Sequence, residues 1–161
     1  MRQLFLKVHM METRLSTLLP LMEEAFRQGE CFTIYPGGTS MLPLLRPHED
    51  GVRLAPPPEE IRRGDVLLCR RRDGSFVLHR VLRLCGETFE MVGDNQLYRE
   101  GGFRRDNVVA KAIGRVREEV YQSFEEGPLA RYGRRRLRTF PIRSFFGRLK
   151  KRLCKTRKKN H

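Results

Sequence analysis

The feature that most constrains the fold is a series of short apolar segments separated by turn signals. They are residues 32–35, 52–55, 65–70, 75–84, 88–92 and 108–116. The turn Arg72-Asp73-Gly74 joins two of them in a pattern typical of a β-hairpin. Short strands at this spacing predict a mainly β domain with minor α content, built from coiled antiparallel sheets or closed into a small barrel.

A helical pattern of apolar residues precedes the first of these segments. Its members are Leu15, Leu18, Leu19, Met22 and Phe26, at spacings typical of one helix face. Because proline disfavours a helix interior, Pro20 predicts that the regular helix covers only Pro20–Gln28. Gly29 is expected to end this helix, which packs against the β domain.

Basic charge is concentrated at the C-terminal end of the chain. The sequence has 33 Lys and Arg against 19 Asp and Glu, a formal net charge of +14. Residues 127–161 hold the whole excess and no acidic residue, so residues 1–126 are formally neutral. We therefore divide the chain into an N-terminal helical segment (1–30), a β-rich domain (31–118) and a basic, partly helical or disordered tail (119–161). An excess confined to a tail is weak grounds for nucleic-acid binding by the folded domain.

Within the tail, a short amphipathic helix is predicted to begin at Pro141, since proline suits the first helical turn. The apolar face consists of Ile142, Phe145, Phe146, Leu149 and Leu153. Helices of this kind lie on anionic membrane surfaces, which makes such a surface a candidate partner. A solvated, disordered tail is the alternative. Nucleic acid is a less favoured partner because the tail lacks a recognised binding module.

Cysteine spacing and hydropathy limit the other function classes. Cys31, Cys69, Cys85 and Cys154 form no CxxC pair, so we expect no zinc site and no redox motif. The longest uncharged run, Cys31–Leu45, is shorter than the roughly 20 apolar residues of a membrane span. The N-terminus lacks the long apolar core of a secretion signal. The expected location is cytoplasmic, with the tail as a peripheral membrane attachment, and the sequence specifies no oligomeric state.

Ser40 is the first candidate for chemistry. It lies in Gly37-Gly38-Thr39-Ser40-Met41-Leu42-Pro43, where glycines and proline favour a tight turn that presents the hydroxyl. His79 lies in mid-strand, within Val77-Leu78-His79-Arg80-Val81. Its apolar neighbours favour the neutral, proton-accepting imidazole. A hydroxyl and an imidazole on rigid elements are the minimum parts of a serine hydrolase, although a lone strand histidine is more often a packing residue.

In that interpretation Ser40 attacks a carbonyl carbon while His79 accepts the hydroxyl proton. The developing oxyanion needs fixed donors. Candidate oxyanion and substrate contacts are the neighbours of the serine, Gly38, Thr39 and Met41, with their backbone N–H groups.

The order of five segments resembles that of signal peptidases and of the LexA-like self-cleaving repressors, which share a fold. The segments are Gly38-Thr39-Ser40-Met41-Leu42-Pro43-Leu44, Arg63-Gly64-Asp65-Val66, Val77-Leu78-His79-Arg80-Val81, Val92-Gly93-Asp94-Asn95 and Ala112-Ile113-Gly114-Arg115-Val116. The resemblance covers about residues 32 to 118, and the five blocks in order are more specific than the serine motif alone. It implies a domain of coiled sheets and serine endopeptidase activity without a metal or organic cofactor.

The same resemblance implies roles for single residues. Most bacterial signal peptidases and LexA-like proteins place a lysine at the base position, whereas Leu78-His79-Arg80-Val81 is similar to the endoplasmic-reticulum and SipW-like type. That type uses serine and histidine. By resemblance, Ser40 is the nucleophile and His79 the base.

An acid that orients the imidazole is less well specified. Asp94 lies in the Gly-Asp-Asn block, and Glu100 lies six residues further on, near the position where this type has an aspartate. The glutamate is a departure from that pattern. Asp106 is a third candidate. Asp94 is equally well explained as a turn residue that caps its own backbone.

Three functions follow from these observations. The leading hypothesis is a serine endopeptidase that removes a leader or signal segment from a precursor protein or peptide. Two departures bear on its substrate: the expected membrane anchor is missing, and Gly38 stands where a second hydroxyl often helps to bind the oxyanion. The second hypothesis is a self-cleaving LexA-like regulator, although thirty residues are too few for an N-terminal helix-turn-helix domain. The third is a non-catalytic binding module held at a membrane or nucleic acid by its tail.

Overall fold

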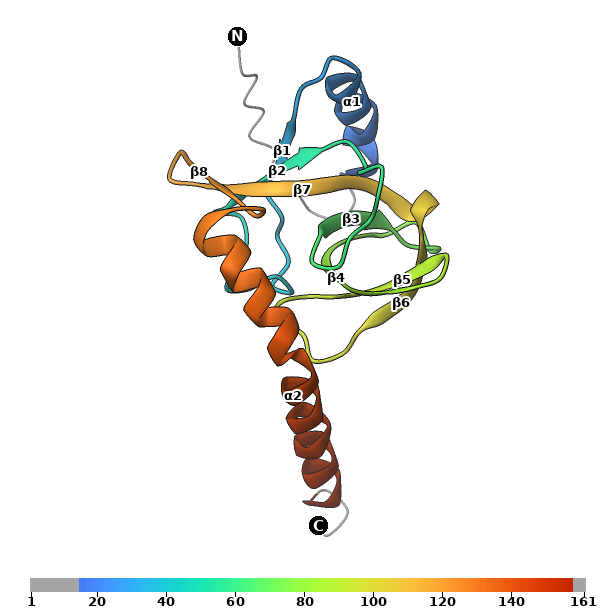
Figure 1. The fold of residues 1–161 in the computed structure, drawn as a ribbon, viewed down its shortest axis with the longest axis vertical. Helices are drawn as coiled ribbons and strands as arrows, with labels where there is room; N and C mark the ends of the chain where they lie inside the picture. The colour runs from blue at the N-terminus through green and yellow to red at the C-terminus, as the bar shows by residue number, and fades with distance from the viewer. Residues whose placement is uncertain (1–14, 158–161) are drawn as a thin grey trace.

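The computed structural model describes residues 15–157, with side chains described as far as Gly147. Within this part the chain forms eight strands and two α-helices (Figure 1). In chain order they are α1 (Leu15–Arg27), β1 (Phe32–Ile34), β2 (Gly51–Ala55), β3 (Val66–Arg70), β4 (Phe76–Cys85), β5 (Thr88–Val92), β6 (Glu100–Arg104), β7 (Val108–Arg117), β8 (Val120–Ser123) and α2 (Gly127–Arg157). A short 3-10 turn, Arg105–Asn107, separates β6 from β7.

The strands form one antiparallel sheet in the order β1-β2-β7-β3-β4-β5-β6. The long strand β7 organises it, because β2 pairs with one edge while β3 and β8 share the other. Residues Val108–Ala112 pair with β3, and residues Gly114–Arg117 pair with β8. The predicted mainly β fold is confirmed. The sheet remains open between β1 and β6, so the barrel among our expected forms is not what this chain builds.

Both faces of the sheet carry a buried core, as alternation along β3 shows. Val66 and Leu68 belong to a core that includes α1 and the segment after β1. Leu67 and Cys69 point to the opposite face, into a second core with side chains of β5 and β6. Because both faces of the sheet are covered at β3, the sequence of this strand is an almost continuous apolar run.

Helix α1 begins earlier than the sequence predicted. It includes Pro20, and its buried residues Leu15 and Met22 face the first core. Pro20 is exposed, so its ring and missing N–H lie on the solvent side of the helix. The expected end is confirmed, since Gly29 adopts a left-handed φ of 74° just after the last turn.

Helix α2 differs more from expectation. Pro141 lies in its interior, and the helix starts fourteen residues earlier, at Gly127. From Ala130 to Ser144 the helix packs against the rest of the protein through a row of buried residues. These are Ala130, Gly133, Leu137, Phe140 and Ser144. The C-terminal part of the helix extends beyond the sheet (Figure 1), and the side chains of Leu149 and Leu153 lie outside the described set. Neither helix within residues 15–157 is both long enough and apolar enough to cross a bilayer.

Candidate active site

Ser40 lies in a turn that follows β1, and the loop between β5 and β6 holds it from one side. The backbone N–H of Asn95 donates to the Ser40 carbonyl oxygen at 2.7 Å, and Asn95 Nδ2 donates to the Thr39 carbonyl at 3.3 Å. A Cβ at Gly93 would lie 2.7 Å from the Ser40 carbonyl oxygen. Only glycine permits this close approach, which explains the glycine of the Gly-Asp-Asn block.

Strand β7 holds the far end of the same segment through two arginines. Arg115 Nη1 donates to the Leu44 carbonyl at 2.6 Å. Arg117 donates to both oxygens of the fully buried Asp50, at 2.6 and 2.5 Å, and the Arg46 N–H adds a third bond. Burial alone raises the pKa of Asp50, but these hydrogen bonds outweigh it and hold the pKa below its ordinary value. The serine turn is thus fixed at both ends.

A cavity of about 340 Å³ opens beside this turn. Ser40 and His79 both line it, as do the three residues expected to bind the oxyanion or substrate, Gly38, Thr39 and Met41. Within the described residues no hydrogen bond joins the serine hydroxyl to the imidazole. Catalytic hydrogen bonds are often long without substrate and tighten only in the reacting complex. The two candidate reacting groups therefore share one concave site of a size suited to a ligand.

His79 is deeply buried on β4, at 2% exposure, and faces Leu67 on the neighbouring strand. Val77 and Val81 share its core face, as predicted from the alternation. Burial is the main reason that the pKa of His79 is lowered to about 4. Among the described residues, its Nδ1 atom has no hydrogen-bond partner. The resting imidazole is consequently neutral and incompletely paired.

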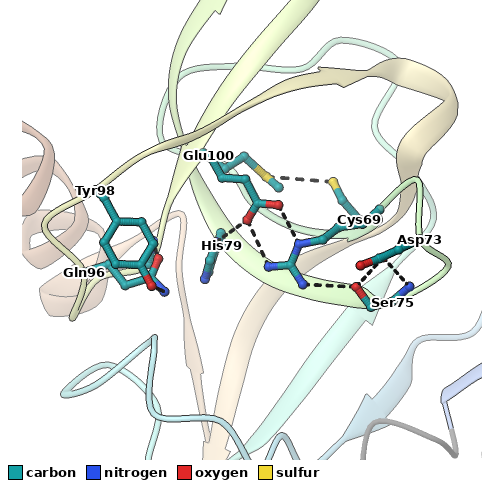
Figure 2. Close-up of polar contacts among 10 residues, drawn as sticks. Cys69, Asp73, Ser75, His79, Gln96, Tyr98 and Glu100 are labelled. Carbon is teal, nitrogen blue, oxygen red and sulfur yellow. Dashed lines mark hydrogen bonds and ion pairs between the residues drawn. The ribbon is translucent and has the colours of Figure 1, made fainter.

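Glu100 is the acid that contacts this imidazole. Its Oε2 atom lies 4.0 Å from His79 Nδ1 (Figure 2), and it favours the protonated imidazole. Arg71 donates to both carboxylate oxygens of Glu100, at 2.5 and 2.9 Å, and to Ser75 Oγ at 3.3 Å. The positive charge of Arg71 opposes protonation of His79. Sequence reasoning missed Arg71, because nothing in the run of basic residues after β3 distinguishes it.

Asp94 has a different environment. It is 1% exposed, and both of its carboxylate oxygens accept hydrogen bonds from Arg80, each at 2.9 Å. Arg80 also donates to the Gly64 carbonyl, and Arg136 of α2 donates to the Asp94 carbonyl at 2.7 Å. Asp94 therefore bonds to the block that contains Arg80 and to α2, and Arg80 extends this network to the block that contains Gly64. The third candidate acid, Asp106, is exposed in the 3-10 turn and lines no part of the cavity.

Gln96 was not anticipated from the sequence either. It lines the cavity, its side-chain oxygen accepts from the Gly93 N–H at 3.2 Å, and its Nε2 donates to the Tyr98 hydroxyl at 3.1 Å (Figure 2). A glutamine directly after an Asp-Asn pair carries no sequence signal of its own. Comparison with known protein families, curated proteins and solved structures finds no match to this chain.

Proposed function

We propose that the chain is a serine endopeptidase in which Ser40 is the nucleophile and His79 the general base. The observation that carries the proposal is the shared cavity, lined by a fixed serine turn and a buried, neutral imidazole. The resemblance to the serine–histidine type of signal peptidase supports the same assignment. The proposed substrate is a precursor protein or peptide from which a leader segment is removed.

The proposed reaction begins when Ser40 Oγ attacks the scissile carbonyl carbon and its proton passes to His79. Since Nδ1 faces Glu100, we assign the proton transfer to Nε2. The backbone N–H groups of the turn, at Ser40 and Met41, are the candidate donors to the oxyanion. His79 then gives its proton to the leaving amine, and water attacks the acyl-serine in a second, equivalent cycle.

A pKa of about 4 makes His79 a weak base at rest, and the surroundings account for how it can still act. Charge separation occurs only as the serine attacks, when the negative oxyanion and the Glu100 carboxylate both favour the imidazolium ion. Glu100 is thus proposed as a positioning residue that compensates this charge. Arg71 holds the carboxylate in place and limits its effect on the resting imidazole.

The test uses full-length protein and a defined mixture of synthetic peptides, with fragments identified by mass spectrometry over time. Wild-type protein is expected to produce fragments, whereas Ser40→Ala produces none and unfolds at the same temperature. Ser16→Ala, on the exposed face of α1, is the matched control and should cleave normally. Equal fragment yields from wild type and Ser40→Ala would overturn the proposal.

A further inference from the structure

The outward face of α2 has a composition that the packing of the helix does not explain. One side of the helix is buried against the sheet through residues such as Gly133, Leu137 and Phe140. The opposite side is exposed and changes character along its length. Residues 131–138 present arginines there, and residues 142–146 present large apolar side chains. A helix that packs on one side normally exposes polar residues on the other.

The arginine part of this face forms a shallow basic hollow. It is lined by Arg63, Arg131, Arg134, Arg135 and Arg138, together with Leu137. The four arginines contributed by α2 are exposed, and none forms an ion pair within the described part of the chain. Unpaired guanidinium groups at helical spacing suit an array of phosphates, which they bind in a bidentate manner.

The apolar part follows directly. Ile142, Phe145 and Phe146 are 62%, 57% and 61% exposed, and the two phenylalanine rings contact each other edge to face. The neighbouring Ser144 is buried and Arg143 donates to the Asp94 and Gln96 carbonyls, so these three apolar side chains occupy the side of the helix that the domain leaves uncovered. Contiguous exposed apolar side chains on a polar rim mark an interaction site.

We propose that this face of α2 binds the surface of an anionic phospholipid bilayer. The arginines contact lipid phosphates, and Ile142, Phe145 and Phe146 enter the boundary between headgroups and acyl chains. From Arg131 to Phe146 the helix rises about 22 Å, so it can contact headgroups at one end while its apolar end penetrates. The absence of acidic residues after Glu126 makes the whole face complementary to negative lipids.

Binding in this way places the cavity close to the membrane. The sheet-facing side of α2 donates from Arg136 and Arg143 to the Asp94 carbonyl, and Arg143 also donates to the Gln96 carbonyl. Gln96 lines the cavity that contains Ser40. The bilayer-binding face and the cavity are thus connected through one helix, with hydrogen bonds on its inner side.

The test measures co-sedimentation of full-length protein with vesicles of phosphatidylcholine, alone or mixed with phosphatidylglycerol. We expect binding only to the mixed vesicles, weakened by added salt. Arg131→Gln with Arg135→Gln should weaken binding roughly thirtyfold. Phe145→Ser with Phe146→Ser should weaken it more than tenfold. All four positions are exposed, so unchanged thermal unfolding is expected.

Matched controls lie elsewhere on the surface. Arg70→Gln with Arg72→Gln removes two exposed charges, and Val120→Ser removes an exposed apolar residue; both should bind like wild type. Equal binding to neutral vesicles, or full binding by the double phenylalanine variant, would overturn the proposal. Two further results would overturn it. One is a wild-type dimer that the double phenylalanine variant dissociates in sedimentation, and the other is tighter binding to an oligonucleotide than to the vesicles. Vesicle binding does not require catalysis, so it stands or fails separately from the peptidase proposal.

Discussion

His79 and Arg80 are neighbours on β4 and almost equally buried, at 2% and 3% exposure, yet their surroundings differ completely. Arg80 has a two-bond carboxylate partner in Asp94 and a further acceptor at Gly64. His79 has an orphaned Nδ1 and a carboxylate, Glu100, at 4.0 Å. The buried polar side chain on one face of the strand has hydrogen-bond partners, whereas the one on the other face has an atom without a partner.

This difference distinguishes a residue that stabilises the fold, Arg80, from a candidate for proton transfer, His79. A buried charge that is fully hydrogen-bonded fixes the fold, and removing its partner is costly. A buried neutral imidazole beside an open cavity can still accept a proton. The same strand therefore carries a structural ion pair and a candidate base, one residue apart.

The largest expected effect is the loss of peptide cleavage when His79 is replaced. His79→Gln should lower the rate of peptide cleavage by about 10²–10⁴, the usual contribution of a general base, without loss of stability. Cleavage rates and urea unfolding measure the two quantities. His48→Gln, in an exposed turn, serves as the control and should retain the wild-type rate. A His79→Gln variant with undiminished cleavage would contradict the assignment.

The second prediction concerns Arg80 and Asp94. Asp94→Ala leaves a buried guanidinium unpaired, and we expect it to lower the free energy of unfolding by about 3–5 kcal/mol. Urea unfolding measures this loss. Replacing both members, as Arg80→Met with Asp94→Leu, should recover part of it. If Asp94→Ala were as stable as wild type, the ion pair would have no supporting role.

The third prediction is a pH dependence of stability. In the unfolded chain His79 takes up its proton near pH 6.5, whereas in the folded protein its pKa is about 4. Between these values the unfolded state binds more protons, so folding stability falls as the pH is lowered. The contribution is about 3 kcal/mol across this window. His79→Gln should remove that part of the slope in urea unfolding measured from pH 7 to pH 4, and an unchanged slope would contradict the buried neutral imidazole.

The smallest predicted effect tests Glu100. Glu100→Gln removes the nearest charge that favours imidazolium, so the pKa of His79 should fall further and cleavage should slow about tenfold. NMR titration of the imidazole and cleavage rates measure the two effects. Glu90→Gln, at a carboxylate paired with Arg83 away from the cavity, is the control. A rise in the pKa of His79 would show that Glu100 does not act on it.

Much of the sheet was predictable because its strands carry the local signals that define strands. Alternation placed Val77, His79 and Val81 on one face, and the turn at Asp73-Gly74 joined the correct hairpin. The strand β6 was missed because its sequence, Glu-Gly-Gly-Phe-Arg, contains two glycines and one apolar residue. β8 was missed because three of its four residues are exposed and its pairing with β7 decides its conformation.

The helices show where local rules fail. Pro20 and Pro141 were expected to limit helices, but both rings lie on exposed helix sides. The inner side of α2 includes Gly133 and Ser144, which interrupt the apolar pattern of that side. In the site, the serine turn and the histidine were identifiable from their neighbours. The ion pair of Arg71 with Glu100 was not, since it joins residues far apart in sequence.

The hydrogen bonds from α2 to the Asp94 carbonyl have a practical consequence for how this protein is handled. The chain from Asp94 to Asn95 connects those arginines to the amide that grips the Ser40 carbonyl. Trimming the cationic end of the chain to obtain a shorter fragment would therefore remove a brace of the serine turn. Any activity lost on such shortening would report on that missing brace as much as on the removed charge.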